Sequence, residues 1–410
     1  MLLGFRFRRV ASDGQACRVC AVLRPVRQPS GCLFVLHELK FRLFPRDFEG
    51  VGSYRVIYPY GFLEANTDHE CTFEVDGQVG NQVRLCFPDP KTEEADGDVY
   101  VLQIRWERIV PGVIDWLHSQ GKAVVVELDD WYHGMHPSNP AVESLRKRKH
   151  IDSLEALTRG IYKADLVTVS TPRLGELYGR MNPNVAVLPN YLRWANWTDV
   201  TPAFEQDRRV RVGWQGTMKW RGDDLSVLRG LIRPFLERNP HVDFVSVGDK
   251  TSVVHDYLDI PLDRRLQVQG NIFPRHTRPT ATIDIGLVPL SFTEFNECKS
   301  CLKGMEYAAC GIPCVASKTV PYRDWVDEGV NGFLARKPKD WLRHLELLVN
   351  DDDLRRQMGR NAFQKVQSFT FESGRWQEWN DLYSRWGLST CSTSDTSVSS
   401  SGQPVLATST

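Results

Sequence analysis

The sequence predicts an α/β protein, and three observations carry that prediction. Short runs rich in Val, Ile and Leu alternate with segments of helical composition over most of the chain. The alternation stops between Tyr191 and Arg209, where Pro202 and several charges indicate a linker, and then begins again. Buried strands separated by helices are typical of parallel sheets. We therefore expect two Rossmann-like domains that face a central cleft, with ligands at the carboxyl ends of the strands.

The first series of elements precedes the linker. SYRVIYPY (53–60) is the first candidate strand, and DVYVLQI (98–104) is a buried strand followed by a helix that ends at Gly121. The run AVVVEL (123–128) predicts a strand that leads into Asp129 and Asp130. The remaining elements of this series are a helix around 152–163 and strands over 165–171 and 184–190.

The second series follows the linker. Its predicted strands cover 209–216, 243–248, 266–270, 283–290 and 313–317, and one helix lies near 223–238. A further helix is expected over 297–310, with Asn296 as its N-cap and Gly311 just past its end. On that helix Lys299, Lys303 and Glu306 would share one stripe, while a second stripe of Leu302, Met305 and Ala309 would pack.

Five ranges follow from this pattern. Residues 1–50 show no period and form an uncertain N-terminal extension, residues 51–200 form the first domain, and residues 201–345 form the second. Helices are expected over 346–387, and the Ser/Thr-rich tail 388–410 is predicted to be disordered. The helical spacing of four aromatic residues near the end predicts core packing rather than a sugar-stacking platform: Trp376, Trp379, Tyr383 and Trp386.

Composition excludes some classes of protein. Among 410 residues, Lys plus Arg total 51 and so do Asp plus Glu, which argues against a protein that coats nucleic acid through bulk charge. No run reaches the roughly eighteen apolar residues of a membrane span, and the N-terminus lacks the apolar core of a signal peptide. We therefore expect a cytoplasmic protein whose ten cysteines are free thiols.

The stretch NECKSCLKGMEYAACGIPC (296–314) offers two kinds of chemistry. Its four thiols have the spacing of two pairs, but the residues between the pairs have helical composition, which disfavours a zinc site and favours packing. Lys299 and Lys303 near a helix N-terminus favour an anion, and Glu306 can accept hydrogen bonds from the diol of a ribose. The alternative is a solvated face with a Lys303–Glu306 ion pair, which is worth little.

The longer stretch IDIGLVPLSFTEFNECKSCLKGMEYAACGIPCVAS (283–317) resembles the C-terminal domain of GT-B glycosyltransferases, particularly the retaining family 4. The resemblance implies that Glu306 binds the ribose of the nucleotide. The family's first glutamate, which contacts the donor sugar, is replaced here by Cys298, and Glu297 is one position out of register. The pattern looks like a divergent branch seen in bacterial and phage enzymes, in which Lys299 and Lys303 would take over donor contacts.

The stretch VGWQGTMKWRGDDL (212–225) is similar to the first βα turn of the same domain. Its two glycines would let the backbone approach the donor phosphates, and its basic residues would neutralise the leaving diphosphate. The resemblance thus implies a donor site formed by Gly213, Gly216, Thr217, Lys219, Arg221, Asn296, Lys299, Ser300, Lys303 and Glu306.

In the first domain the stretch VVVELDDWYHGMHPSNP resembles an Asp-Asp element of the same branch. Asp129 and Asp130 would orient an acceptor hydroxyl or the donor sugar, or bind a metal, and the alternative is strand-end capping or an ion pair. With Lys219 and Lys299 they are the expected catalytic residues. His133 and Asn190 are expected on the acceptor side.

The resemblance implies a glycosyltransferase of the hexosyltransferase type with the GT-B fold, whose C-terminal helix crosses back to the first domain. It would transfer a sugar, with retention, from a UDP- or GDP-linked donor to an acceptor hydroxyl, without a cofactor or a bound metal. The acceptor is open among a glycan, a lipid, a protein and a modified DNA base, and a phage enzyme would act in the host cytoplasm. The alternatives are a sugar-nucleotide epimerase or phosphorylase on this fold, and a non-catalytic module that binds glycan or nucleic acid.

Overall fold

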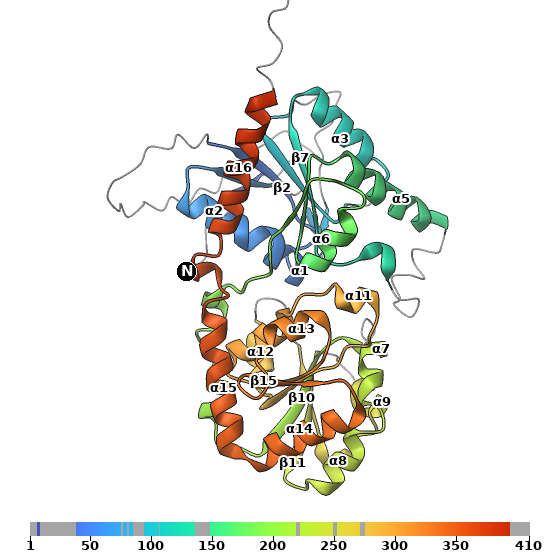
Figure 1. The fold of residues 1–410 in the computed structure, drawn as a ribbon, viewed down its shortest axis with the longest axis vertical. Coiled ribbons are helices and arrows are strands. Elements are labelled where there is room, and N and C mark those ends of the chain that lie inside the picture. Colours follow the sequence, from blue (N-terminus) through green and yellow to red (C-terminus); the bar gives the residue numbers. More distant parts are fainter. Residues whose placement is uncertain are drawn as a thin grey trace, which may run out of the picture.

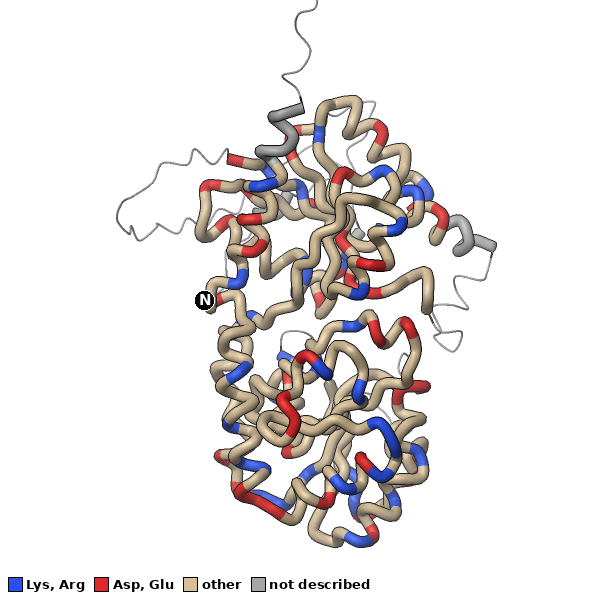
Figure 2. Tube along the Cα trace, in the orientation of Figure 1, with Lys and Arg blue, Asp and Glu red and all other residues tan. Residues whose placement is uncertain are grey.

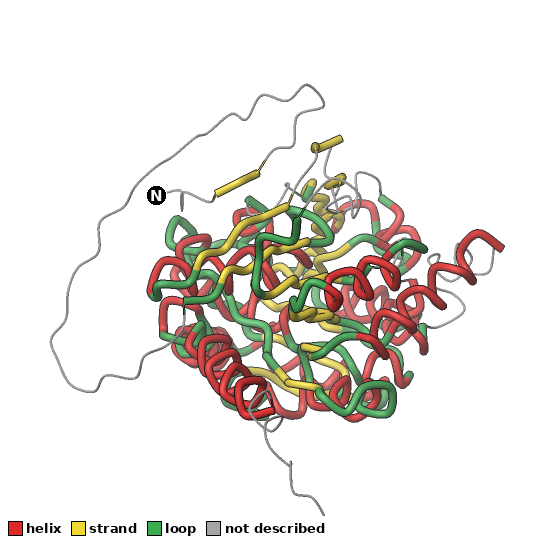
Figure 3. The backbone as a smooth tube through the Cα atoms, turned by 90° about the horizontal axis from the view of Figure 1, so that it is seen from above, coloured by secondary structure: helices red, strands yellow, loops and turns green. Residues whose placement is uncertain are grey.

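The chain folds into two α/β domains, each built around one parallel sheet (Figure 1). The computed structural model describes residues 6–8, 38–74, 77–79, 82–84, 94–105, 107–135, 148–218, 222–248, 252–270 and 275–393. Viewed from above, the strands lie between helices that cover both faces (Figure 3). The predicted fold class, two Rossmann-like domains in the GT-B arrangement, is confirmed.

The sheet of the first domain has seven strands in the order β1-β3-β2-β6-β7-β8-β9, and all neighbouring pairs are parallel. The strands are β1 (Arg6–Arg8), β2 (Lys40–Phe44), β3 (Glu70–Glu74), β6 (Val99–Gln103), β7 (Ala123–Leu128), β8 (Leu166–Val169) and β9 (Val185–Val187). A separate hairpin joins β4 (Gly77–Val79) to β5 (Gln82–Arg84). The helices are α1 (Gly50–Gly52), α2 (Tyr58–Asn66), α3 (Val110–Ser119), α5 (Arg148–Lys163) and α6 (Pro172–Tyr178), and a π-helix, η1 (Ser53–Ile57), joins α1 to α2.

The predicted strand at SYRVIYPY is wrong, because these residues form η1 and the start of α2. All eight of them are buried, from Ser53 to Tyr60. A helical segment that is buried on every side has no amphipathic period, so its apolar run looks like that of a buried strand.

Strand β2 lies inside the first fifty residues, for which the sequence predicted no element. It occupies the middle of the sheet between β3 and β6, and four of its five residues are buried. Arg42 hides the pattern, because a charged residue breaks the apolar run. In the fold its guanidinium donates to both carboxylate oxygens of Asp96 at 2.9 Å and to the hydroxyl of Thr72 at 3.0 Å.

The sheet of the second domain has six strands in the order β12-β11-β10-β13-β14-β15, again with parallel neighbours. They are β10 (Val210–Gly216), β11 (Val242–Gly248), β12 (Arg265–Gln269), β13 (Ile285–Val288), β14 (Cys314–Ser317) and β15 (Gly332–Ala335). The five strands predicted after the linker all form. The helices are α7 (Gly222–Leu225), α8 (Ile232–Arg238), α9 (Val253–Tyr257), α10 (Thr277–Thr280), α11 (Glu294–Glu297), α12 (Leu302–Ala309), α13 (Val320–Trp325), α14 (Pro338–Asn350) and α15 (Asp352–Gln367).

The helix predicted over 297–310 is shorter than expected and is divided in two. Helix α11 is capped by Thr293, whose hydroxyl accepts from the backbone N–H of Asn296, and α12 begins only at Leu302. Asn296 is therefore not an N-cap, and Lys299 lies before α12 rather than on it. Gly311 follows the end of α12 with φ +66°, the left-handed conformation expected at this position.

The C-terminal helix α16 (Gln377–Thr393) leaves the second domain and lies against the first, whereas α15 stays on the second (Figure 1). Trp379 and Tyr383 are buried, the ring of Tyr383 lies 4.8 Å from that of Phe41, and its hydroxyl bonds that of Tyr60. The predicted crossing and the core packing of these aromatic residues are confirmed. The helix continues past Leu388, where the sequence predicted disorder, and residues 394–410 lie outside the described part.

Candidate active site

A cavity of about 290 Å³ opens between the two domains, at the carboxyl ends of both sheets. Polar side chains from each domain line it. The first domain contributes Tyr54, Arg55, Asp129, Asp130 and Asn190, and the second contributes Lys299, Ser300, Lys303 and Glu306. Basic and acidic residues are interspersed over both domains, so the charges of the site are set by local contacts (Figure 2).

Asp129 and Asp130 reach the cavity because β7 ends at Leu128, which places the next two residues beyond the carboxyl edge of the sheet. The hydroxyl of Tyr132 donates to Oδ1 of Asp129 at 2.6 Å. Burial, helped by the charge of Asp130, raises the pKa of Asp129 to about 7. Asp129 can therefore gain or lose a proton near neutral pH.

Asp130 is paired across the domain boundary. The ammonium of Lys299 lies 3.0 Å from Oδ1 and 3.1 Å from Oδ2 of Asp130, and it also stands 4.2 Å from the ring centre of Phe295. Lys299 points at the first domain because it lies in the turn between α11 and α12. The predicted stripe of Lys299, Lys303 and Glu306 on one helix is accordingly wrong as helix geometry, although all three residues line the same cavity.

A second polar chain links the domains through Arg55. Its guanidinium holds Glu127 with two bonds, at 2.7 and 3.1 Å, and donates to Oδ1 of Asn190 at 3.0 Å. The amide of Asn190 then donates to the hydroxyl of Ser300 at 2.8 Å. Arg55 and Glu127 are 1% and 2% exposed, so their charges are satisfied within the protein. Asn190 and Ser300 are thereby fixed at the cavity wall.

Glu306 lies on α12, and one of its carboxylate oxygens is contacted from both domains. The hydroxyl of Tyr54 donates to Oε1 at 2.9 Å, and Nε2 of His276 lies 3.3 Å from the same atom. Burial alone would raise the pKa of Glu306, but the hydrogen bond and charge of His276, together with Lys303 and Tyr54, lower it. The carboxylate is therefore kept ionised in a largely buried place.

Lys303 lies one turn before Glu306, and its ammonium donates to the backbone oxygen of Gln215 near the end of β10. The same ammonium stands 5.9 Å from the centre of the Trp214 ring. The end of the first strand of the second domain is thus tied to α12. Lys303 and Glu306 therefore line the same cavity as Lys299, which pairs with Asp130 of the first domain.

Several predicted donor residues lie elsewhere. Gly213 is in the middle of β10, where a Cβ would come within 2.7 Å of Ile283, and Gly216 ends the strand. Thr217 is exposed just after β10. Asn296 is 3% exposed and donates to Asp224 at 2.7 Å and to the backbone oxygen of Ser291 at 2.9 Å, so it fixes the loop. Lys219 and Arg221 lie outside the described residues.

His133 also lies away from the cavity lining. Its Nε2 bonds the hydroxyl of Thr158 at 2.8 Å, and its ring contacts those of Trp131 and Tyr178. Burial lowers its pKa. The side chain belongs to an aromatic cluster with Trp131 and Tyr178, and the hydroxyl of Tyr178 donates to the backbone oxygen of Asp130.

The thiols of the 296–314 stretch are separated by the fold. Cys298 is fully buried against the apolar residues of the first domain, while Cys310 and Cys314 lie in the larger core shared with the second. Burial raises the pKa of the Cys298 thiol to about 12. Glu297 accepts from the backbone N–H of Val320 at 2.6 Å. Within the described ranges, no group of three or more His, Cys, Asp or Glu side chains is placed to hold a metal ion.

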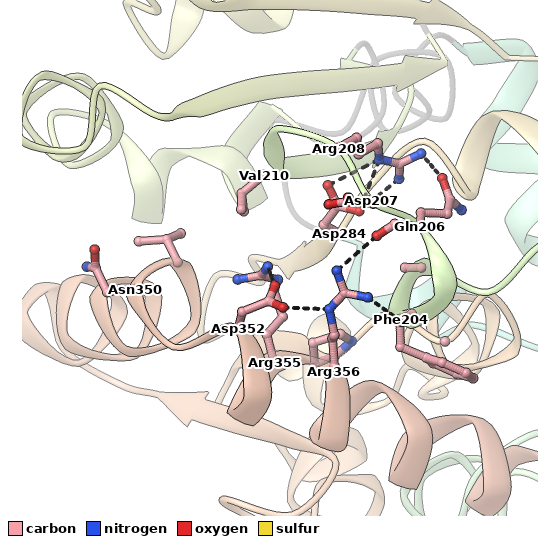
Figure 4. A pocket seen from close by; sticks show the side chains of 14 residues that line it. Phe204, Gln206, Asp207, Arg208, Val210, Asp284, Asn350, Asp352, Arg355 and Arg356 are labelled. Atoms are coloured by element: carbon pink, nitrogen blue, oxygen red, sulfur yellow. Dashed lines mark hydrogen bonds and ion pairs between the residues drawn. The ribbon is translucent and has the colours of Figure 1, made fainter.

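A second cavity, of about 250 Å³, lies between the linker and the start of α15, among alternating arginines and aspartates (Figure 4). Arg208 is paired with Asp284 at 2.8 Å, and Arg356 with Asp352 at 2.6 Å. Arg356 also donates to the backbone oxygen of Phe204 at 2.9 Å. These ion pairs hold the linker against α15. The charges of Arg208 and Arg356 are balanced by the aspartates beside them.

Sequence reasoning missed Tyr54, Arg55 and His276. The first two lie in the segment misread as a strand, and His276 has no neighbouring motif. The only available signal was composition, since a Tyr and an Arg within an apolar run require buried partners.

Comparison with known proteins defines the class of the fold. The chain resembles the sucrose-phosphate synthase of Thermosynechococcus elongatus, with 14% identity, coverage of 86% of this chain and 100% of that chain, and a TM-score of 0.57. It also resembles Anabaena Alr3699/HepE in complex with UDP and glucose, with 15% identity, coverage of 85% and 100%, and a TM-score of 0.58. At these identities the likeness shows the fold alone, and that fold is GT-B.

The matching family model covers most of the second domain. The family described as "Glycosyl transferases group 1" matches residues 209–351. The D-inositol 3-phosphate glycosyltransferase of Corynebacterium jeikeium is 39% identical over 74 residues, which are 18% of this chain and 18% of that protein. Residues 209–351 therefore carry the sequence of this family, on a chain that has the GT-B fold. None of the helices in the described ranges combines the length and the hydropathy that a bilayer crossing needs.

Proposed function

We propose that the protein is a glycosyltransferase that moves a sugar from a nucleotide-sugar donor to an acceptor hydroxyl. The observation that carries this proposal is the cavity between the domains, where Glu306 and Lys303 of the second domain face Asp129 and Asp130 of the first. The cavity lies at the carboxyl ends of both sheets, where ligands bind in open α/β folds. The family match over residues 209–351 and the UDP in the complex of Anabaena Alr3699/HepE support the proposal.

The donor would be held by residues of the second domain. Glu306 is an ionised carboxylate in a largely buried place. An ionised carboxylate is a strong acceptor for the hydrogen bonds that ribose hydroxyls donate. Lys303 and Lys299 supply positive charge near the start of α12, where a diphosphate would be stabilised. Lys219 and Arg221 stay predictions for the same role. In this assignment the second domain, predicted at 201–345, binds the donor, and the first domain, predicted at 51–200 but also containing β1 and β2, binds the acceptor.

The transfer would proceed with retention. The acceptor oxygen forms a bond to the anomeric carbon on the face from which the leaving group departs, and the bond to the diphosphate oxygen breaks. The electron pair of that bond stays with the nucleoside diphosphate, whose phosphate oxygen takes the proton of the acceptor hydroxyl. The lysines stabilise the charge that develops on the leaving group. This scheme needs no bound metal, in line with the absence of a cofactor that the sequence predicts.

The acceptor side would be formed by Asp129, Asp130 and Asn190, which reach the cavity from the first domain. Cys298 is buried where the family places its sugar-contacting glutamate, so the identity of the donor sugar must depend on other groups. A hexose donor linked to UDP or GDP, the cytoplasmic setting and the bacterial or phage origin stay predictions of the sequence.

The test is incubation of the protein with a panel of UDP-, GDP- and ADP-linked sugars, read by the release of nucleoside diphosphate. One donor should release its nucleoside diphosphate slowly into water and faster with a hydroxylated acceptor, and the anomeric configuration of the product should match that of the donor. Conversion of the sugar without release and without acceptor would instead identify an epimerase. Absence of turnover with every donor would favour the binding module.

A further inference from the structure

One oxygen of Glu306 is occupied from two sides. Oε1 accepts from the hydroxyl of Tyr54 at 2.9 Å and faces Nε2 of His276 at 3.3 Å. Within the described part of the chain, no hydrogen bond engages Oε2 of Glu306. The side chain of Glu306 is 12% exposed and lines the cavity, so this second oxygen is available to a ligand.

The two partners come from different parts of the chain. Tyr54 lies in the π-helix η1 of the first domain, a rare kind of helix that is frequent at functional sites. His276 precedes α10 in the second domain, and the ring of Trp197 from the linker stands 5.5 Å from it, edge to face. Both side chains are themselves held in place, since Tyr54 is 4% exposed and the side chain of His276 is 13% exposed.

We infer that Tyr54 and His276 are positioning residues that fix Oε1 of Glu306, so that Oε2 accepts a hydrogen bond from a ribose hydroxyl of the nucleotide. The inference rests on the proposed function and deepens it, because it names the residues that prepare the nucleotide site. A carboxylate with one oxygen that accepts a hydrogen bond from Tyr54 and faces the ring of His276 cannot rotate freely. Binding the ribose therefore costs less ordering of the side chain.

Tyr54 gives this arrangement a second consequence. Its hydroxyl is the first domain's contact with the nucleotide-binding carboxylate, although the rest of the inferred nucleotide site belongs to the second domain. The bond forms only while the two domains stand as they do here. Nucleotide affinity is thus linked to the closed arrangement, and binding energy that depends on closure can be used to assemble the site for transfer.

The experiment compares ribose with deoxyribose. Calorimetric titrations of UDP and 2′-deoxy-UDP are carried out on the native protein, Tyr54→Phe, His276→Leu and His276→Gln. If GDP or ADP binds the native protein instead, the same comparison is made with that nucleotide and its 2′-deoxy form. Tyr60→Phe is the matched control, because it also removes a buried tyrosine hydroxyl, but one that bonds Tyr383 in the first domain. The melting temperature of each variant reports whether it is folded.

We expect the native protein to prefer the ribonucleotide by roughly tenfold, the size of one hydrogen bond to a charged group. Tyr54→Phe and His276→Leu should lose most of this preference through weaker binding of the ribonucleotide. His276→Gln should keep part of it, because an amide N–H can replace the imidazole donor, and Tyr60→Phe should keep all of it.

The two possible failures are distinct. If the native protein shows the preference and both Tyr54→Phe and His276→Leu retain it in full, the positioning role is overturned while the donor site stands. The assignment of Glu306 fails if the native protein binds none of UDP, GDP and ADP, or if it binds a ribonucleotide and its deoxy form equally well. The inference fails with that assignment.

Discussion

The ammonium of Lys299 lies 3.0 Å from Oδ1 of Asp130, and this ion pair joins the two domains at the wall of the cavity. The side chains are 13% and 26% exposed, so the pair is partly shielded from water. A contact of this kind both holds the domains together and places a cation beside the carboxyls of the first domain. Its removal therefore affects stability and function in separable ways.

Replacing Lys299 by Met leaves Asp130 without its partner, and replacing Asp130 by Asn leaves Lys299 without its own. We expect each single variant to lose about 1–3 kcal/mol of stability and the double variant to lose less than the sum. Chemical denaturation of the four proteins, followed by tryptophan fluorescence, measures the coupling. Additive losses would mean that the pair contributes nothing in solution.

The pKa of Asp129, raised to about 7 by burial and by Asp130, predicts a pH effect on stability. The folded protein holds this proton up to about pH 7, whereas the unfolded chain releases it near pH 4, so stability falls as pH rises through that window. Asp129→Asn should remove this contribution, and its melting temperature should exceed that of the native protein more at pH 8 than at pH 5. The same difference at both values would contradict the raised pKa.

Cys298→Glu restores the residue type of the family's sugar-binding position. The structure predicts that it does not restore a sugar contact, because Cys298 faces the apolar core of the first domain. We expect a loss of several kcal/mol from a buried charge, against about 1 kcal/mol for Cys298→Ala. Thermal melts and donor titrations measure both effects. A stable Cys298→Glu variant with tighter donor binding would refute the orientation.

The packing of α16 on the first domain predicts which substitutions in this helix reduce stability most. Trp379 is 1% exposed within the core, whereas Trp386 is only half-buried. Trp379→Ala should cost about 3–5 kcal/mol, and Trp386→Ala should cost less, because less of its ring is removed from water. Hydrogen exchange should show that Trp379→Ala exposes α2 and β2 sooner than β10. Equal losses in both variants would argue against the packing of this helix on the first domain.

Much of the fold was predictable from local pattern, and the exceptions have physical causes. Strands such as β7 and β13 are mostly apolar runs between turns, so they could be read directly. The segment around Tyr54 is buried all round and lost its helical period, while Arg42 interrupted the pattern of β2. Both segments are stabilised by residues distant in the sequence: Tyr54 bonds Glu306, and Arg42 bonds Asp96.

The site divides in the same way. Asp129 and Asp130 were predictable because residues that follow a buried strand lie at the cleft, and Glu306 was predictable from the resemblance. Tyr54 and His276 were not, because each meets Glu306 only after distant segments pack together. The turn before Leu302 also separates Lys299 from the helix that its spacing suggested. Spacing along a helix is informative only where the helix is continuous.

The central claim is that the cavity between the domains holds a nucleotide through Glu306. The most direct measurement is equilibrium binding of UDP, GDP and ADP to the native protein and to Glu306→Ala, with Glu346→Ala on α14, away from the cavity lining, as a control. We expect one of the three nucleotides to bind the native protein and the control alike, and to bind Glu306→Ala at least roughly tenfold more weakly. Equal binding to the native protein and Glu306→Ala, or no binding by any of the three, would contradict the account.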